Sequence, residues 1–178
     1  IRGIEPLRTE LADNVNKRYQ TTMDAEDIVI TAGCNQAFCS VVDTLCQTGD
    51  EAIVPIPFYF NHQMWLDARG INCKFLDFNA QTAMPDPEQA RRLITDKTKA
   101  ILLISPNNPT GAIYSPDCLS QFYEVAKEAG LALVVDETYR DFIDVNDVPH
   151  GLFNKPDWQD TFIHLYSFSK VYSLTGFR

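Results

Sequence analysis

The sequence lacks the cysteine spacing of a disulfide-stabilised or zinc-binding protein. It has five cysteines, an odd number, and no two of them form a Cys-x-x-Cys pair. Small secreted domains and zinc sites normally use paired cysteines at short, regular spacings. We therefore expect a cytoplasmic protein with reduced thiols and no metal site. The cysteines are Cys34, Cys39, Cys46, Cys73 and Cys118.

Basic residues and long apolar segments are also scarce. The chain has 15 Lys and Arg residues against 24 Asp and Glu residues, which gives a formal net charge of -9. Nucleic-acid binding depends on clustered positive charge, so we expect no nucleic-acid partner. No apolar run reaches the roughly 18 residues that a membrane span requires, and no signal peptide is recognisable at the start. We therefore expect a soluble protein that does not bind membranes.

The 178 residues do show an alternation of short apolar runs with segments of helical spacing, without a linker or repeat. Several runs are apolar at every position, which is typical of buried parallel strands. Asp86 and Ser115, each followed by proline, are typical helix N-caps, and Gly130 is a typical helix end. The pattern predicts one α/β domain, a mainly parallel sheet flanked by helices. The predicted strands are 28–30, 52–54, 73–78, 100–104, 131–135 and 162–166, and the predicted helices are 6–19, 36–46, 60–68, 87–94 and 116–129.

The turns that follow the predicted strands carry polar residues. Ligands of open α/β sheets bind outside the carboxyl ends of the strands. After residues 28–30, the small-residue turn 31–36 leads into a helix whose free N–H groups could bind a phosphate, although such turns are also common as plain connectors. The turn 105–111 presents the amide of Asn108 between two prolines, and its alternative interpretation is a rigid turn without a ligand.

Two further turns add an acid and an amine. Asp136 follows a fully apolar run, where a carboxylate is costly without a cationic or proton-donating partner, although a helix N-cap is the alternative. Tyr139 lies three residues further on, and Lys170 and Arg178 follow the last run; Lys170 alone would be interpreted as a solvated surface charge. Together these groups fit pyridoxal phosphate catalysis, in which a lysine holds the aldehyde and an acid keeps the pyridine nitrogen protonated.

At these positions the sequence resembles the class I/II aminotransferases, which are fold type I pyridoxal phosphate enzymes. The joint pattern is Asn-Asn-Pro-Thr-Gly at 107–111, Asp-Glu-x-Tyr at 136–139, Ser-x-Ser-Lys at 167–170 and Gly-Phe-Arg at 176–178. The similarity runs in order along nearly the whole chain. It implies the large domain of a PLP-dependent transferase-like fold.

The resemblance also implies roles for individual residues. Lys170 would carry the cofactor as a Schiff base and then shuttle the proton between the substrate Cα and the cofactor C4′. Asp136 would pair with the pyridinium nitrogen and keep the ring an electron sink. Asn108 and Tyr139 would hydrogen-bond the 3′ oxygen of the cofactor and tune the pKa of the lysine–cofactor linkage.

The phosphate and the pyridine ring have their own matching positions. An arginine suits the phosphate because its planar fork can make two bonds to one group. The aromatic residue that stacks on the ring matches Tyr59, although Phe58 and Phe60 flank it. We expect His62 to be a structural histidine. The residues that match the phosphate-binding positions are Gly33, Cys34, Asn35, Ser167 and Arg178.

Members of the family are considerably longer than this chain. We therefore expect residues 1–178 to be an incomplete PLP-binding large domain, without the N-terminal arm and the C-terminal small domain, and the chain to be a fragment or part of a longer protein. The arginine that clamps the substrate carboxylate lies in the absent domain of the family. The antiparallel strand that neighbours residues 28–30 in the family follows Gly-Phe-Arg, so that strand should lose a neighbour.

These observations predict a PLP-dependent aminotransferase that moves an amino group from an amino acid to a 2-oxo acid, and the resemblance implies that it acts as a homodimer. A lyase or synthase of the same fold, such as a carbon–sulfur β-lyase, is one alternative, because the same cofactor site serves both. A second alternative is the aminotransferase-like, ligand-sensing domain of a transcription regulator. A third is that this part of the protein binds no cofactor by itself.

Overall fold

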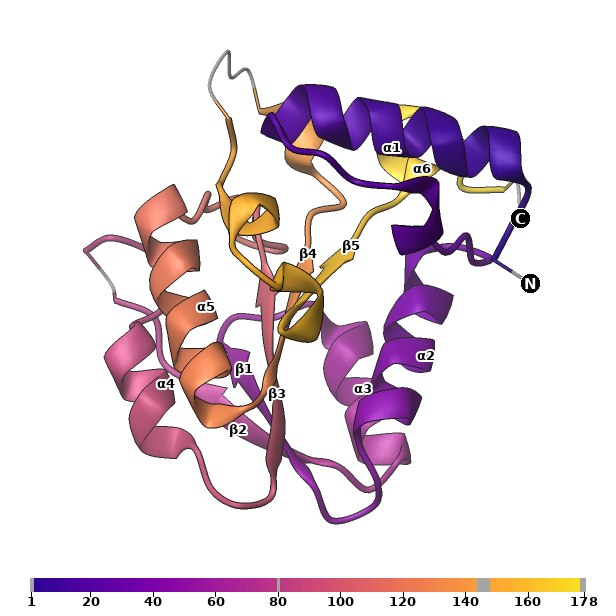
Figure 1. Ribbon diagram of the computed structural model, residues 1–178. Coiled ribbons are helices and arrows are strands. Elements are labelled where there is room, and N and C mark those ends of the chain that lie inside the picture. The colour runs from indigo at the N-terminus through magenta and orange to yellow at the C-terminus, as the bar shows by residue number, and fades with distance from the viewer. Residues whose placement is uncertain (1, 80, 144–147, 177–178) are drawn as a thin grey trace.

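Five parallel strands form the centre of the structure (Figure 1). The computed structural model describes residues 2–79, 81–143 and 148–176. Each strand pairs in parallel with its neighbours, as the uninterrupted apolar runs predicted. The strand order is β2-β1-β3-β4-β5, with β1 (Glu51–Pro55), β2 (Asn72–Leu76), β3 (Thr98–Ile104), β4 (Ala132–Asp136) and β5 (Phe162–Leu165).

Helices cover both faces of this sheet. Figure 1 shows α4 and α5 on one side and α2 and α3 on the other, with α1 lying across one end. None of the helices within the described residues is long and apolar enough to cross a membrane. The helices are α1 (Glu5–Tyr19), α2 (Cys34–Leu45), α3 (Phe60–Ala68), α4 (Pro87–Leu93), α5 (Pro116–Ala129) and α6 (Phe168–Val171), and short 3₁₀ turns lie at Ala25–Asp27, Arg140–Phe142, Leu152–Asn154 and Trp158–Asp160.

The pleat of the strands divides the core into two layers. In β3, Ile101 and Leu103 pack in the layer of α1, α4 and α5, whereas Ala100 and Leu102 pack in the layer of α2 and α3. Side chains that alternate along a strand therefore serve opposite faces. The same alternation decides which residues reach which side of the carboxyl edge of the sheet.

The helix ends expected from the sequence are confirmed. The Ser115 hydroxyl accepts the Cys118 N–H at 3.2 Å, and the Asp86 carboxylate accepts the Glu88 N–H at 2.9 Å. Gly130 ends α5 with the left-handed conformation (φ 65°, ψ 33°) that glycine adopts without strain. Local capping chemistry thus fixes where the connections to the sheet begin.

The strand predicted at residues 28–30 is wrong. Ile28 is extended, with φ -110° and ψ 133°, but the segment pairs with none of the strands of the described sheet. The Ile30 N–H donates instead to the Arg2 carbonyl at 2.9 Å, and Val29 is 60% exposed. A β-branched run becomes a strand only where a neighbouring strand completes its ladder, and residues 2–79, 81–143 and 148–176 offer this segment no such strand. The predicted strand 73–78 also ends earlier, at Leu76.

Candidate functional site

Three neighbouring strands end at the same level of the sheet. Ile104 of β3 lies in register with Asp136 of β4, which lies in register with Leu165 of β5. The Ser105 N–H donates to the Asp136 carbonyl at 3.0 Å, and the Glu137 N–H donates to the Leu165 carbonyl at 2.9 Å. The segments that carry the predicted site residues therefore leave the sheet side by side. This edge is where ligands of α/β sheets bind.

Asp136 is buried at this edge with few partners. It is 7% exposed, and its Oδ1 accepts the Thr138 N–H at 2.9 Å. Its Oδ2 lies 3.7 Å from His62 Nε2 and 3.8 Å from the Cys34 sulfur, both longer than ordinary hydrogen bonds between nitrogen or oxygen atoms. The next helical turn in the described chain is the 3₁₀ turn Arg140–Phe142, whose N-cap is Tyr139, so Asp136 is not an N-cap. A buried carboxylate oxygen of this kind can accept a further cationic or proton-donating group.

His62 lies beside this carboxylate, a position that the sequence interpretation missed. Its ring stacks on Phe38, with centroids 4.0 Å apart and an interplanar angle of 20°. Burial lowers the pKa of His62, and the nearby Asp136 charge opposes that shift only in part. The imidazole is therefore neutral near pH 7. Its spacing of three residues from Tyr59 was the available signal, because residues three apart at a helix start share a face.

Tyr59 is the aromatic residue of its segment that faces the site. It precedes α3, and its ring meets the His62 ring edge-on at 5.5 Å. Burial raises the pKa of the Tyr59 phenol, and Tyr139, Asp136 and Cys34 raise it further through their proximity. Residues from three separate connections thus lie close enough to act on one another electrostatically.

The two aromatic residues that flank Tyr59 face elsewhere. Phe58 stacks on Phe75, with ring centroids 5.4 Å apart, and packs against the α2 and α3 layer of the core. Phe60 begins α3 and is 61% exposed.

The Tyr59 hydroxyl accepts the Asn61 side-chain N–H at 2.7 Å, which orients the phenol. Asn61 is a second site neighbour that the sequence did not single out.

The turn at Gly33 opens α2 toward the same region. Gly33 is the N-cap of this helix with φ 89°, a value that side chains other than glycine rarely adopt. The Thr31 hydroxyl donates to the Gly33 carbonyl at 2.9 Å and holds the turn closed. The first N–H groups of a helix have no partner within it, so those of Cys34 and Asn35 are available to an anion.

An open cleft of about 420 Å³ lies beside Asn108 and Tyr139. The preceding residue, Asn107, is buried and structural: its Nδ2 donates to the Pro57 carbonyl at 3.3 Å, and its Oδ1 accepts the Thr110 hydroxyl at 2.9 Å. Asn108 makes no such contacts within the described chain. The remaining lining is mostly apolar and consists of Pro106, Asn107, Pro109, Gly111, Ile113, Phe142 and Ile143.

Ser167 and Lys170 lie on the last described helix. Ser167 is buried, and its hydroxyl accepts the Ser169 N–H at 3.1 Å as the N-cap of α6. Lys170 is exposed on α6 and makes no hydrogen bond or ion pair with the residues that the structure describes. The structure therefore groups Cys34, Tyr59, Asp136 and Tyr139, while Lys170 stands apart from their contacts. Arg178 lies outside the described residues.

Comparisons with known proteins agree over the whole chain. The family profile for aminotransferase class I and II matches residues 1–178. A probable aspartate aminotransferase of Methanocaldococcus jannaschii is 31% identical, and the match covers 99% of this chain and 46% of the relative. The glutamate-pyruvate aminotransferase AlaA of Escherichia coli is 30% identical, over 99% of this chain and 44% of the relative. The chain thus spans about half the length of the curated relatives it matches.

Solved structures confirm the predicted fold. A mutant aspartate aminotransferase of Thermus thermophilus matches with a TM-score of 0.91 and 29% identity, covering 99% of this chain and 48% of that one. An alanine aminotransferase of Pyrococcus furiosus matches with a TM-score of 0.89 and 29% identity, covering 99% and 45%. The α/β fold with its parallel sheet, predicted from apolar runs and helix caps, is therefore that of the aminotransferases.

Proposed function

This chain belongs to the class I and II aminotransferase family, and from that premise we propose that it forms most of the cofactor site of a pyridoxal phosphate-dependent aminotransferase. The reaction would move an amino group from an amino acid to a 2-oxo acid. Because the chain spans about half of its relatives, the activity belongs to the whole protein. The observation that carries the proposal is the buried Asp136 carboxylate, whose Oδ2 has only two long polar contacts, to His62 Nε2 at 3.7 Å and to the Cys34 sulfur at 3.8 Å.

Asp136 fits the pyridine nitrogen of the cofactor. Pyridoxal phosphate, when bound, supplies a ring that accepts the negative charge left on the substrate Cα. A buried carboxylate with a free lone pair would hold the proton on the ring nitrogen and so sustain that capacity. His62 is neutral beside Asp136, so it would not neutralise the carboxylate. The burial of Asp136 then favours a charged partner over water.

Lys170, Asn108 and Tyr139 would act on the reactive side of the cofactor. The exposed Lys170 amine would bind the aldehyde and, when released, would move the proton from the substrate Cα. Asn108 and Tyr139 line the same open cleft, where their amide and phenol groups would hold the 3′ oxygen. Tyr59, half-buried and edge-on to the His62 ring, would stack on the pyridine ring.

The phosphate would lie at the start of α2. The free N–H groups of Cys34 and Asn35 and the positive end of the helix favour an anion there. Gly33 allows the close approach of the backbone. Ser167 would add its hydroxyl and Arg178 a guanidinium, which matters in a chain with a net charge of -9. We infer that residues 1–178 are the PLP-binding large domain in incomplete form.

The oligomeric state, the cellular location and the reaction type of the whole protein remain predictions. We propose a homodimer, because Phe60 and Met64 on α3 are exposed apolar side chains that an interface would cover. Light scattering on the whole protein tests this. A cytoplasmic location fits five free cysteines. The named relatives favour amino transfer over the lyase and regulator alternatives, since each is named an aminotransferase.

Borohydride trapping tests the proposal directly. The whole protein is mixed with pyridoxal phosphate, reduced and digested, and the labelled peptide is located by mass spectrometry. We expect an absorbance band on the order of 410–430 nm before reduction and the label on Lys170. A label spread over other lysines, or no band, would contradict the proposed cofactor site. A bound label without turnover of any amino acid would favour the ligand-sensing alternative.

A further inference from the structure

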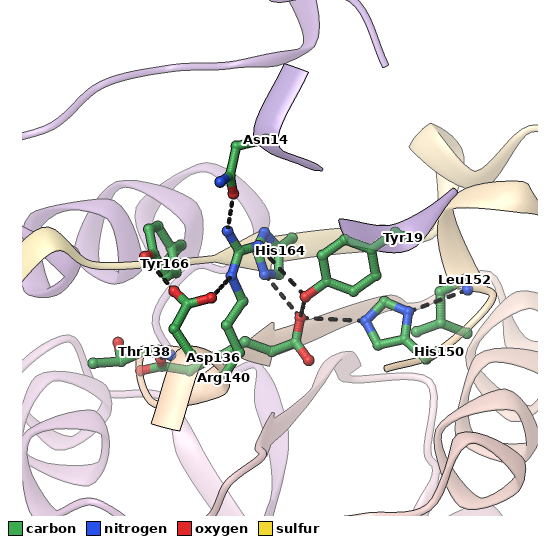
Figure 2. Close-up of polar contacts among 11 residues, drawn as sticks. Asn14, Tyr19, Asp136, Thr138, Arg140, His150, Leu152, His164 and Tyr166 are labelled. Carbon is green, nitrogen blue, oxygen red and sulfur yellow. Dashed lines mark hydrogen bonds and ion pairs between the residues drawn. The ribbon is translucent and has the colours of Figure 1, made fainter. Parts of the chain in front are cut away.

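A buried polar cluster lies on the face of the sheet opposite to Asp136. Figure 2 shows Tyr19 of α1, Arg140 of the turn after β4, His150 of the segment before Leu152, and His164 of β5. None of them is a proposed cofactor ligand, yet Tyr19, Glu137, Arg140 and His150 are each at most 3% exposed. Burying so many ionisable groups is costly unless they satisfy one another. We call Tyr19, Glu137, Arg140, His150 and His164 the Glu137 cluster.

One carboxylate oxygen is the centre of this cluster. Glu137 Oε2 accepts the Tyr19 hydroxyl at 2.5 Å and lies 3.2 Å from His150 Nε2 and 2.9 Å from His164 Nε2. The Leu152 N–H donates to His150 Nδ1 at 3.3 Å, so neutral His150 carries its proton on Nε2 and donates it to Glu137. The geometry therefore fixes Glu137 as an ionised acceptor held from three directions.

Arg140 extends the cluster in two directions. Its guanidinium lies 4.0 Å above the centroid of the Tyr166 ring, and its Nη2 donates to Asn14 Oδ1 of α1 at 2.8 Å. The Tyr166 hydroxyl donates to Asp141 Oδ2 at 2.5 Å, and Arg140 Nε lies 3.6 Å from Asp141 Oδ1. Figure 2 shows Arg140 between Asn14 and Tyr166. A stacked, paired guanidinium of this kind is rigid.

Two residues of the cluster, and Tyr166 beside it, are chain neighbours of proposed cofactor ligands. Glu137 follows Asp136, Arg140 follows Tyr139, and Tyr166 precedes Ser167. A residue fixed on one face of the backbone limits how far its neighbour can move on the other. A displacement of about 1 Å is enough to cost a catalytic group much of its effect. The contacts of Glu137, Arg140 and Tyr166 therefore limit the movement of the segments that carry Asp136, Tyr139 and Ser167.

We propose that Arg140 and Glu137 are positioning residues that couple the docking of helix α1 to cofactor binding. Asn14 and Tyr19 bring α1 into the cluster, so that α1 contributes to the alignment of Tyr139 and Ser167 without touching the cofactor. This inference rests on the proposed function. Coupling between two equilibria is reciprocal. If docking of α1 strengthens cofactor binding, then cofactor binding must stabilise the docked position of α1 by the same free energy.

Variants of α1 test this coupling in the whole protein, because α1 contains no proposed ligand. Asn14→Ala removes the acceptor of Arg140, whereas Asn14→Asp keeps it. Asp13→Ala is the matched control, because Asp13 is an exposed neighbour on α1 that makes no hydrogen bond or ion pair with the residues that the structure describes. Tyr166→Phe removes the hydroxyl that donates to Asp141 but keeps the ring under Arg140. For each variant, the dissociation constant of pyridoxal phosphate and amide exchange across residues 5–19 are measured.

The expected result is a split between these variants. Asn14→Ala and Tyr166→Phe should weaken cofactor binding about fivefold, and Asn14→Asp and Asp13→Ala should bind like the unmodified protein. The pH midpoint of the absorbance band of lysine-bound cofactor should also shift in Asn14→Ala, because Tyr139 moves. Cofactor should slow amide exchange in α1 of the unmodified protein, and this protection should shrink in Asn14→Ala.

Two results would overturn the coupling, and they differ from each other. If Asn14→Ala binds the cofactor as tightly as Asp13→Ala does, with unchanged protection of α1, the cluster serves stability alone while the proposed cofactor site stands. If the unmodified protein shows neither the absorbance band nor protection, the proposed function fails and the coupling fails with it. A fold check by circular dichroism accompanies each variant.

Discussion

Asp136 and Glu137 are adjacent carboxylates, both buried, whose surroundings are opposite in character. Asp136 accepts one N–H at 2.9 Å, and the next groups are His62 and Cys34 at 3.7 and 3.8 Å. Glu137 has three polar groups within 3.2 Å of a single oxygen. Protein groups already surround the contacted oxygen of Glu137, whereas the Asp136 carboxylate has only one short contact and so has more capacity for a ligand.

The pleat of β4 causes this difference. Val134 packs in the layer of α2 and α3, and Val135 packs in the layer of α1, α4 and α5. The Glu137 N–H still bonds to Leu165, so the alternation continues one residue past the strand. Asp136 therefore faces α2 and α3, while Glu137 faces α1. Two adjacent carboxylates thereby lie on opposite faces of the sheet, which is why we propose a ligand-binding role for Asp136 and a structural role for Glu137.

The largest effect should come from removing the satisfied carboxylate. Glu137→Leu leaves Tyr19, His150 and His164 without their acceptor in the protein interior. We expect the free energy of unfolding, measured with urea, to fall by about 3–5 kcal/mol. Glu124→Leu is the control, because Glu124 pairs with Lys155 at the surface and should cost about 1 kcal/mol at most. If Glu137→Leu and Glu124→Leu lose the same free energy of unfolding, the buried contacts of Glu137 do not stabilise the fold more than a surface ion pair does.

Replacing Asp136, the partly satisfied carboxylate, should lower the activity far more than the stability. Asp136→Asn keeps an acceptor for the Thr138 N–H but removes the charge that faces the proposed ring nitrogen. We expect kcat/KM of the whole protein to fall about 10²–10³-fold, because a preorganised charge is lost. The free energy of unfolding should change by less than about 1 kcal/mol. Full activity in this variant would remove Asp136 from the site.

Lowering the pH should reduce the free energy of unfolding through protonation of Glu137 and His164. Burial alone would raise the pKa of Glu137, but His150 and His164 outweigh it and hold that pKa well below its usual range. Burial also lowers the pKa of His164 from its usual 6.5, although Glu137 opposes the shift. Both groups bind more protons when unfolded, so both contribute stability at pH 7 that is lost as the pH falls through their unfolded and then folded pKa values.

Urea unfolding at a series of pH values measures this loss. Stability should begin to fall near the usual histidine pKa of 6.5 and fall further below the usual carboxyl value of 4.5. In His164→Gln, much of the loss of stability that begins near pH 6.5 should disappear, whereas the loss below pH 4.5 should remain. If the variant keeps the whole slope between these two values, His164 is not the group that takes up the proton.

Much of the fold could be predicted from local chemistry. Helices α3 and α5 have the predicted bounds, because a proline after Ser115 and a glycine after Ala129 fix the ends of α5. The error at Ile28–Ile30 has the opposite cause, since a strand needs a partner that residue types do not reveal. Propensity was therefore sufficient for helices and insufficient for the edge of the sheet.

The site was predictable to the extent that motifs follow strand ends. The motifs led to the proposal of Asp136 and Tyr139 as site residues, but they did not lead to His62, because its relation to Asp136 depends on how α3 packs on the sheet. The Glu137 cluster was also missed. Its members Tyr19 and His164 are 145 positions apart in sequence and share no motif. Only tertiary packing brings their side chains to one carboxylate.

The smallest predicted effect concerns Cys34, which reports on the Asp136 side. Burial raises the pKa of the Cys34 thiol, and the Asp136 charge raises it further. Asp136→Asn removes that charge, so more thiolate forms and alkylation by iodoacetamide should speed up about threefold. Cys39 is the internal control, because the acid beside it is Asp43 and its rate should not change. Pyridoxal phosphate should slow Cys34 but not Cys39, since its phosphate would cover the start of α2. If both thiols respond alike, the region around Asp136 opens as a whole, and the free oxygen of its carboxylate is accessible to water rather than reserved for a ligand.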